Sequence, residues 1–575
     1  MTRLRARIGW SAILLLGGLT ITAQSDVASA APTCYGPVTT PCVVVNGLVI
    51  EPIIQNVQGS IPTNFDFAPD GKIFVSDKVG RILVYSGRGA AGGSAQVVVD
   101  LQNEVHSYWD RGILGLAVDP DFANSPYVYF LYTYNRDPKS GASAPQWPAQ
   151  GCNDPPGGGG SGPSTGDGCV VSARIGRVKV NPATGLAVEA KQTIFDSNSS
   201  GGWCEQFPSH SIGTLMFGPD GMLYAGAGDG ASFDTADYGQ FGGQRPGTPV
   251  PANPCGDPND AGGGGRGNAL SLPTSQGGSL RSQSVRSNVG DGYQPYDGSI
   301  IRINKDGSVP GDNPLANIGG SAGNKAPIVA YGLRNPFRFN FKPGTQQLWV
   351  GDVGYNSVEE VSHAAVGGTG GGVTAVPNFG WPCYEGDEAN TDFLGRSHLC
   401  DQGLGTAIGN VPSPLITATV AWSHSTDYAV DQGCKPVSSS PGSSSTGGSF
   451  VTATDWPTAL DGAYVFGEYG RQCLFALDAN KQGGGTISLA SATPLASGLA
   501  PIAIRTWEKG RPGGDGAIYV MDAGDLGSGH QTIWRIGTPS SPLARFTMTA
   551  TSGNPPLAEQ FDASNSFVLQ GSVAR

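Results

Sequence analysis

A short β-turn-β unit recurs along the chain and constrains its fold more than any other feature. Each copy has an apolar, β-branched or aromatic run, a turn rich in proline, aspartate or glycine, and a second such run. The clearest copies are F-D-F-A-P-D-G-K-I-F-V-S-D (65–77), L-M-F-G-P-D-G-M-L-Y-A-G-A-G-D (215–229) and F-R-F-N-F-K-P-G-T-Q-Q-L-W-V-G-D (337–352). Proline fixes φ in such a turn, aspartate hydrogen-bonds to its backbone, and glycine takes the left-handed conformation. Each copy therefore predicts a tight antiparallel hairpin.

Three further copies, at 114–134, 461–478 and 514–536, bring the predicted hairpins to six. Strand-like segments at 173–180 and 299–304 would extend the hairpins to sheets of about four strands. Repetition of one supersecondary unit indicates a repeat architecture, so we predict an all-β fold, a six-bladed β-propeller around a central channel. An irregular pair of β-sandwiches is the alternative.

Composition agrees with a turn-rich β protein. Among the 575 residues are 89 glycines and 43 prolines, and 38% of the chain is hydrophobic, which is enough for a core. Polar, glycine-rich inserts at 140–168, 255–290, 367–372 and 438–448 separate the copies and are expected to form exposed loops. The net charge of −12 argues against nucleic acid or an anionic lipid surface as the main partner.

The N-terminus has the features of a secretory signal. Three arginines precede an apolar run at 8–21, and the small residues at 28–30 offer a cleavage site. The apolar run is short for a membrane span, although a signal-anchor is the alternative. We therefore predict a signal peptide at 1–30, a secreted or periplasmic mature protein, and no membrane insertion after cleavage.

The remaining chain divides into three parts. Residues 31–60 form a lead-in, and 61–537 form the predicted propeller. Residues 541–575 resemble the opening of a PKD domain, an immunoglobulin-like sandwich. Such a sandwich needs about 100 residues, so we interpret this end as a truncated PKD-like segment.

The ten cysteines support export, because an even set in an exported chain usually forms disulfides. No C-x-x-C pair is present to suggest zinc binding or redox cycling. Proximity in sequence makes three pairs plausible: Cys34–Cys42, Cys152–Cys169 and Cys383–Cys400.

Candidate functional residues concentrate between residues 331 and 382. Arg334 and Asn335 lie in the turn Y-G-L-R-N-P, where a cation and an amide can hold a polyanionic or quinone-like ligand by charge-assisted hydrogen bonds. Glu359 and Glu360 follow closely and offer the hard oxygens that Ca²⁺ prefers. A purely structural turn is the alternative for the arginine and asparagine.

A second candidate is His210, which precedes the first strand of the 215–229 copy. A neutral imidazole at the channel mouth could take a proton from an alcohol, and the alternative is a loop histidine bonded to backbone. Asp110 and Arg111 precede the strand of another copy. For these two we prefer a surface ion pair, unless they face the same cavity as His210.

Four motifs, in this order, resemble the soluble PQQ-dependent glucose/sorbosone dehydrogenase family. They are W-D-R-G-I-L-G-L-A-V-D-P-D-F, H-S-I-G-T-L-M-F-G-P-D-G-M-L-Y, G-L-R-N-P and N-F-G-W-P, and the resemblance covers about residues 61–536. It implies a six-bladed propeller that binds PQQ (pyrroloquinoline quinone) at its wide face together with calcium. The implied reaction is oxidation of a sugar hydroxyl or sugar aldehyde, with hydride transfer to PQQ and an external electron acceptor.

The resemblance also implies roles for individual residues. The catalytic residues would be His210, as the base, and Arg334, which would stabilise the charge that builds on reduction. The cofactor would be bound by Arg334, Asn335, Arg471 and Arg505. The substrate would be bound by Asp110 and Ser209. Calcium would be bound by the carbonyls of Gly354 and Tyr355, and a second, structural calcium by Glu360, the carbonyl of Phe379 and Glu359.

Three positions depart from the glucose-oxidising members of that family. Ser209 stands where they carry an aspartate, Gly470 where they carry a cofactor-binding lysine, and Val353 where they carry a glutamine. The chain is therefore more similar to the sorbosone-dehydrogenase-like branch.

Two other functions stay open from the sequence. One is a non-enzymatic extracellular propeller that binds carbohydrate or protein and has lost the cofactor, which the missing lysine favours. The presence of His210, Arg334 and Asn335 together favours the enzyme. The other is a calcium-dependent lactonase-type hydrolase, which needs acidic side chains converging on one axial metal, and no such set can be recognised in the sequence.

Overall fold

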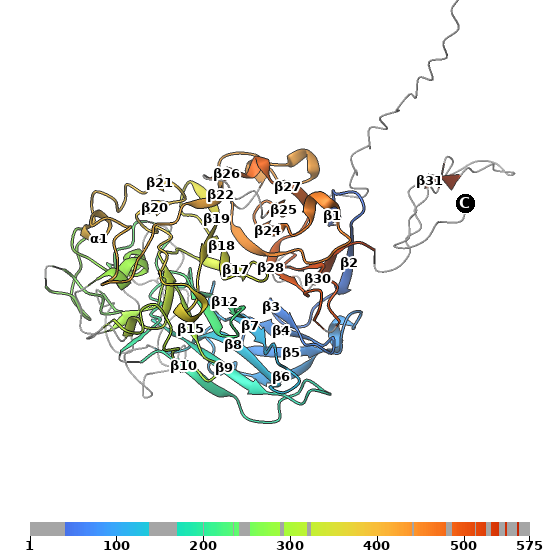
Figure 1. The fold of residues 1–575 in the computed structure, drawn as a ribbon, viewed down its shortest axis with the longest axis horizontal. Coiled ribbons are helices and arrows are strands. Elements are labelled where there is room, and N and C mark those ends of the chain that lie inside the picture. The colour runs from blue at the N-terminus through green and yellow to red at the C-terminus, as the bar shows by residue number, and fades with distance from the viewer. Residues whose placement is uncertain are drawn as a thin grey trace, which may run out of the picture.

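The computed structural model describes residues 41–539 and the backbone of two short strands, β31 (Thr547–Met548) and β32 (Phe561–Asp562), with gaps at 137–169, 199, 234, 241–252, 261, 288–292, 319–323, 440–441, 479–485, 512 and 525–530. Six sheets of at least four strands surround a common centre, and apart from the parallel pair β22–β26 their strands are antiparallel (Figure 1). The predicted six-bladed β-propeller is confirmed. The predicted signal peptide and most of the PKD-like segment lie outside the described residues.

The first three blades each contain four strands in sequence order from the centre outward. Blade 1 consists of β3 (Pro62–Phe67), β4 (Ile73–Asp77), β5 (Arg81–Tyr85) and β6 (Gln96–Asp100). Blade 2 consists of β7 (Ile113–Val118), β8 (Tyr127–Tyr134), β9 (Ser172–Lys179) and β10 (Gln192–Asp196). Blade 3 consists of β12 (Ile212–Phe217), β13 (Leu223–Ala227), β15 (Ser299–Ile303) and β16 (Ile328–Tyr331).

The other three blades each recruit a strand from elsewhere in the chain. Blade 4 consists of β17 (Pro336–Phe341), β18 (Gln347–Asp352), β19 (Val358–Ala365), β22 (Ala418–Ser423) and the distant β26 (Ile487–Ser488). Blade 5 consists of β23 (Ser445–Phe450), β24 (Tyr464–Glu468), β25 (Cys473–Leu477), β27 (Thr493–Ser497) and β1 (Cys42–Val43). Blade 6 consists of β28 (Pro501–Thr506), β29 (Ile518–Asp522), β30 (Thr532–Gly537) and β2 (Val49–Ile54).

Helix is scarce in the described part of the chain. The single α-helix there is α1 (His398–Asp401), and the longest 3₁₀ segment is the buried η3 (Gly278–Arg286). Shorter 3₁₀ segments are Gly92–Ser94, Thr369–Gly371, Val430–Gln432, Val437–Ser439, Thr458–Leu460 and Leu489–Ser491. Two small ribbons complete the elements: β11 (Gly201–Gly202) with β14 (Gln294–Pro295), and β20 (Tyr384–Glu385) with β21 (Glu388–Ala389).

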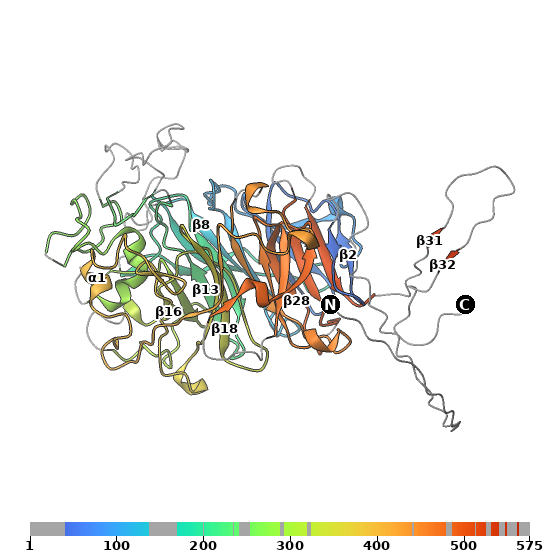
Figure 2. The same cartoon turned by 90° about the horizontal axis from the view of Figure 1, so that it is seen from above.

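The ring is closed by contacts between neighbouring innermost strands, from β3 through β7, β12, β17, β23 and β28 back to β3. The sheets stand side by side around the disc (Figure 2). Apolar side chains from adjacent blades pack between the sheets, as Phe74 of blade 1 and Leu116 and Phe130 of blade 2 do in one cluster. The core is therefore a series of inter-blade layers, and each blade depends on its neighbours for burial.

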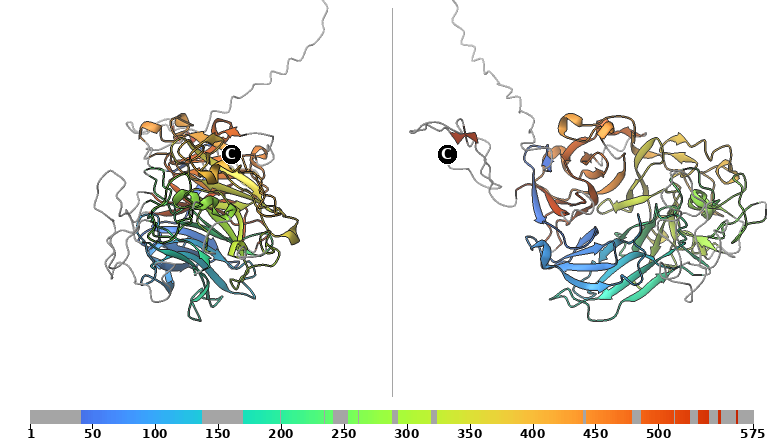
Figure 3. Two further views of the ribbon diagram at one scale, coloured as in Figure 1. Left: turned by 90° about the vertical axis from the view of Figure 1, so that its left-hand side faces the viewer. Right: turned by 180° about the vertical axis from the view of Figure 1, so that it is seen from behind.

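The N-terminal segment closes the circle. Strand β2 pairs antiparallel with β30, with Val49 opposite Gly537, and so forms the outer edge of blade 6. Seen from behind, this blue strand lies against the red strands of the C-terminal blade (Figure 3). The predicted lead-in at 31–60 therefore contributes two strands, β1 to blade 5 and β2 to blade 6.

Two arginines fill the hub between the innermost strands. The Arg338 side chain reaches from blade 4 to the other side, where Nη2 donates to Thr63 O at 2.7 Å and Nε donates to Ile502 O at 2.9 Å. Arg505 Nη2 donates to Leu116 O at 2.9 Å. Burial, with repulsion from Arg505, lowers the pKa of Arg338 to about 9. The hub is thus occupied by side chains, and a site on its axis must lie at one end of the innermost strands.

Three disulfides lie within the described residues, and one of them was predicted. They are Cys204–Cys255, Cys383–Cys400 and Cys434–Cys473. Cys42 is also disulfide-bonded. The other predicted partners, Cys34, Cys152 and Cys169, lie outside the described residues. No helix in the described part of the chain is both long and apolar enough to span a membrane.

Candidate active site

His210 lies immediately before β12, in a backbone conformation that histidine rarely adopts. Its φ is +52°, in the left-handed region. Two hydrogen bonds hold it there: its N–H donates to Asp110 Oδ2 at 3.1 Å, and its carbonyl accepts the Gly230 N–H at 3.1 Å. Such a conformation costs free energy and persists where surrounding contacts impose it. The imidazole is therefore aimed by the fold.

The ring of His210 is oriented by a buried carboxylate that we did not identify from the sequence. His210 Nδ1 lies 2.8 Å from Asp229 Oδ1. Asp229 also accepts the indole N–H of Trp381 at 2.8 Å and the backbone N–H of Ala231 at 3.0 Å. A carboxylate accepts only, so Nδ1 carries the proton of the neutral ring and Nε2 keeps a lone pair.

The electrostatics of this pair favour a neutral imidazole. Burial lowers the pKa of His210, and the nearby positive charge of Arg334 lowers it further, against the opposing attraction of Asp229. Burial alone would raise the pKa of Asp229, but His210, Arg334 and the hydrogen bonds outweigh it and lower that pKa. At neutral pH the site therefore contains a carboxylate and an uncharged base.

Other blades contain carboxylates at positions equivalent to Asp229, but these carboxylates bind backbone N–H groups. The second strand of several hairpins ends in a carboxylate that accepts backbone N–H groups just before the innermost strand. These are Asp77 for Ser60 and Ile61, Asp352 for Arg334 and Asn335, Glu468 for Ser444, and Asp522 for Ala500. In blade 3 the equivalent carboxylate binds a side chain, His210. The carboxylate that recurs at strand ends can be recognised in the sequence. The binding of His210 by one of these carboxylates cannot.

Arg334 lies beside this pair, and not all of its N–H groups donate hydrogen bonds. Its Nη1 donates to Val353 O at 3.1 Å, while its Nε is buried without a hydrogen-bond partner. The guanidinium carbon lies 5.5 Å from the ring centre of Tyr355 and 5.4 Å from that of Trp381. No carboxylate forms an ion pair with it among the described residues. A buried cation between aromatic rings, with an unused donor, fits a planar anionic ligand such as PQQ.

Asp110 and Ser209, the predicted substrate-binding residues, are part of the same cluster. Ser209 Oγ donates to Asp110 Oδ2 at 2.6 Å, and the same oxygen accepts the His210 N–H. The prediction of a surface ion pair with Arg111 is wrong. Arg111 is fully buried, and its Nε lies 3.2 Å from Glu205 Oε2. This pair joins two segments that are 94 residues apart, which no local pattern records.

The two glutamates predicted to bind calcium make different contacts. Both carboxylate oxygens of Glu359 have partners within the protein. Oε2 accepts hydrogen bonds from the N–H groups of Gly354 and Ser445, and Oε1 lies 2.8 Å from His424 Nε2. Glu360 is half-buried, and desolvation together with the charge of Asp352 raises its pKa. No group of three or more His, Cys, Asp or Glu side chains converges as metal ligands anywhere in the described residues. Calcium binding, including by the carbonyls of Tyr355 and Phe379, stays a prediction.

Of the remaining predicted cofactor ligands, the two arginines are engaged elsewhere. Arg471 is buried against Glu468, with Nε 3.2 Å from Oε2, and its Nη2 donates to His424 O. Arg505 lies in the hub. The Asn335 N–H donates to Asp352 Oδ1 at 2.6 Å. The structure therefore brings His210, Arg334, Asp110 and Ser209 together, and it gives Arg471 and Arg505 no shared partner with them.

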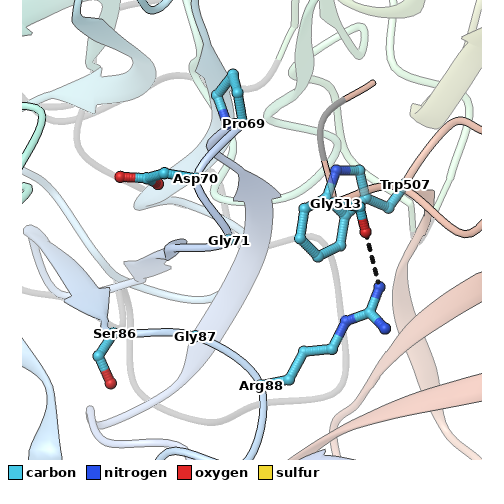
Figure 4. A pocket seen from close by; sticks show the side chains of 8 residues that line it. All are labelled: Pro69, Asp70, Gly71, Ser86, Gly87, Arg88, Trp507 and Gly513. Atoms are coloured by element: carbon cyan, nitrogen blue, oxygen red, sulfur yellow. Dashed lines mark hydrogen bonds between the residues drawn. The ribbon is translucent and has the colours of Figure 1, made fainter. Parts of the chain in front are cut away.

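A surface cavity of about 530 Å³ lies at the opposite ends of the innermost strands, between blades 1 and 6. It is lined by the turn after β3 and by Trp507, and Arg88 packs over the Trp507 ring at 4.6 Å (Figure 4). The other face of this ring stacks on Phe67 at 4.7 Å. Since both faces are covered, this tryptophan has no free face for a ligand, and the cavity is separate from the His210 cluster.

The family model described as Glucose / Sorbosone dehydrogenase matches residues 60–257 and 281–408, more than half of the chain. The chain belongs to the glucose/sorbosone dehydrogenase family. The matched residues include His210, Asp229 and Arg334, so this cluster lies within the part of the chain that defines the family.

The chain is also similar to curated relatives and to a solved structure. Over 321 residues the chain is 25% identical to quinoprotein glucose dehydrogenase B of Acinetobacter calcoaceticus, covering 56% of this chain and 50% of the relative. Over 312 residues it is 25% identical to the HIPL1 protein of Arabidopsis thaliana, covering 50% and 35%. The chain thus spans half or less of the length of these two. The PQQ-bound aldose sugar dehydrogenase of Streptomyces coelicolor has a TM-score of 0.48 and 17% identity, covering 85% and 98%.

Proposed function

We propose that the chain is a PQQ-dependent dehydrogenase that oxidises a hydroxyl of a sugar, or the hydrate of a sugar aldehyde. The observation that carries the proposal is the His210–Asp229 pair, 2.8 Å apart, directly beside the charge of Arg334. Membership of the glucose/sorbosone dehydrogenase family and the names of the relatives support it. PQQ, when bound, would supply the acceptor of the hydride, which carries the two electrons removed from the substrate.

His210 supplies the base. Its neutral Nε2 takes the proton of the substrate hydroxyl while the carbon that bears this hydroxyl loses a hydride, so the C–O single bond becomes a carbonyl. Asp229 holds Nδ1–H and stabilises the imidazolium that forms. Trp381 and Ala231 hold Asp229 in turn, so the base does not need to reorganise during the reaction.

Arg334 supplies the binding charge. Its guanidinium, between the rings of Tyr355 and Trp381, would hold an anionic planar cofactor and oppose negative charge that develops there. Its positive charge also lowers the pKa of His210 and so keeps the base free of a proton. Asp110 would accept hydrogen bonds from substrate hydroxyls, and Ser209 would accept hydrogen bonds from them or donate hydrogen bonds to them.

We further propose that the protein is exported and passes its electrons to an external acceptor. Three disulfides within the described residues favour an oxidising compartment, secreted or periplasmic. Calcium binding stays a prediction, and none of the residue roles above depends on it. The PKD-like segment has no assigned role.

The test is PQQ-dependent dye reduction by purified protein across a panel of sugars. His210→Ala should lower kcat by roughly 10²-fold or more, because a positioned base contributes about 10²–10⁴-fold, while PQQ binding changes little. Arg334→Met should weaken PQQ binding. His398→Ala, at an exposed histidine, is the matched control and should be silent. No PQQ spectrum and no turnover with any sugar would favour the carbohydrate-binding propeller instead.

A further inference from the structure

An exposed aromatic pair lies next to the His210 cluster and has no role in the mechanism above. Trp109 is 47% exposed and Phe233 is 38% exposed, although both are large apolar side chains. Their ring centres are 5.6 Å apart with an angle of 26° between the planes. Buried Phe207 supports both rings edge-on, at 6.1 and 5.5 Å. The pair therefore presents apolar ring surface to solvent on a firm base.

The aromatic pair is continuous with the candidate active site. Trp109 directly precedes Asp110, whose carboxylate accepts from Ser209 Oγ and from the His210 N–H. Phe233 follows Asp229 by four residues on the loop that leaves β13. The segment whose Asp110 binds the His210 backbone and the segment that contains Asp229 thus each carry one of the exposed rings.

The fold fixes Trp109 in place. Its φ is +48°, a left-handed conformation that tryptophan rarely takes and that surrounding contacts must impose. On its C-terminal side, Arg111 is anchored by Glu205 and by the Phe207 carbonyl, which accepts Nη2–H at 3.1 Å. The Asp110 N–H donates to Pro208 O at 3.1 Å. A ring that is fixed before binding loses little conformational entropy when a ligand packs on it.

We propose that Trp109 and Phe233 form a subsite for a second sugar ring, so that the preferred substrate is an oligosaccharide or glycoside longer than one unit. This rests on the proposed sugar oxidation. One face of a pyranose consists largely of C–H bonds and packs on an aromatic ring, while its hydroxyls need acceptors such as the neighbouring Asp110 carboxylate. The unit to be oxidised lies at His210, and the next unit lies over Trp109.

The size of the patch favours a sugar over a protein. A stable protein interface buries about 800 Å² on each partner. Two exposed rings on buried aromatic support cover far less than this, which suits one or two sugar units. Docking of a protein electron acceptor on the same rings is the alternative, and the experiment must distinguish it from sugar binding.

The experiment compares glucose with cello-, malto- and xylo-oligosaccharides of two to four units. Binding is measured by calorimetry on the purified full chain without turnover, and kcat/KM by dye reduction with PQQ. Trp109→Ala should weaken oligosaccharide binding roughly tenfold and raise KM for oligosaccharides, with glucose kinetics within about twofold. Trp109→Phe should restore most of the binding, and Phe233→Ala should act like Trp109→Ala. Val188→Ala, at a 54% exposed residue of blade 2, is the control.

Each outcome decides the proposal. Oligosaccharide binding that depends on Trp109 supports the subsite even when no sugar is oxidised, in which case the proposed dehydrogenase activity fails and the subsite stands. Equal binding of glucose and all oligosaccharides, no binding of any oligosaccharide, or unchanged binding in Trp109→Ala overturns it. Loss of electron transfer to a protein acceptor, with sugar binding intact, overturns it in favour of a docking surface. Melting temperatures within about 2 °C of the unchanged chain exclude misfolding as the cause.

Discussion

At the scale of single residues, one carboxylate decides which nitrogen of His210 can act as a base. Asp229 accepts Nδ1–H and thereby leaves Nε2 free. The same carboxylate attracts the imidazolium and so opposes the lowering of the His210 pKa by burial and by Arg334. Asp229 is a positioning residue, and its replacement should change both the rate and the pH profile.

Asp229→Asn keeps the shape of the side chain and removes its charge. We expect kcat to fall by about 10²–10⁴-fold, because an amide can donate to Nδ1 and favour the tautomer with Nε2 protonated. The acid limb of the unchanged enzyme should lie below pH 6.5, since the His210 pKa is lowered. Without the Asp229 charge this pKa falls further, so the acid limb should move to lower pH. The measurement is kcat between pH 4.5 and 8.

Asp522→Asn is the matched control, because the Oδ1 atom of this strand-end carboxylate accepts backbone N–H groups, from Ala500 and Gly524. It should leave the pH profile unchanged. An acid limb that moves to higher pH in Asp229→Asn, or that does not move at all, would contradict the orientation assigned to His210.

At the scale of elements, the turn between β18 and β19 is held by one glutamate. Glu385 Oε1 accepts four consecutive backbone N–H groups, from Tyr355 to Val358, at 2.8 to 2.9 Å. This turn carries Tyr355, one of the two rings beside Arg334. The carboxylate therefore links the small ribbon β20–β21 to the wall of the candidate cofactor site.

Glu385→Gln should destabilise the protein by about 2 kcal/mol, because charge-assisted hydrogen bonds are replaced by neutral ones. It should also weaken PQQ binding, since the Tyr355 turn loses its anchor. Urea unfolding and a PQQ titration measure the two effects. Glu388→Gln, at an exposed residue of the same ribbon, should do neither. Equal stability of the two variants would show that the carboxylate does not hold the turn.

At the scale of the whole molecule, stability depends on joining the two ends of the propeller. Strand β2 brings Ile53 and Ile54 into the core between blades 6 and 1, and Val57, three residues after Ile54, is buried in the same cluster. Without it, the edge of β30 would be exposed and able to pair with other chains. The ring of sheets is therefore complete only when the N-terminal segment is present.

A shortened chain that begins at Gln58 lacks these three buried side chains. At about 1.5–3 kcal/mol for each, we expect a loss of roughly 5 kcal/mol or more, a large part of the 5–15 kcal/mol typical of a folded domain. Thermal unfolding should shift strongly downward, and size-exclusion chromatography should show association. A chain that begins at Val44 lacks β1 but keeps β2, and it should melt well above the chain that begins at Gln58. Similar melting of the two shortened chains would refute closure by β2.

The amino-acid sequence determined the hairpins, their number and the position of His210 and Arg334 at the beginning of innermost strands. These features follow from turn chemistry and strand patterns between residues only a few positions apart, which a local pattern records. Tertiary structure alone decided the rest. It assigned Asp229 to His210 while equivalent carboxylates bind backbone, joined Trp381 to Asp229 across 152 residues, and used the oxygens of Glu359 for other partners. Contacts across the propeller join segments that are far apart in the sequence, so they could not be predicted from patterns among neighbouring residues.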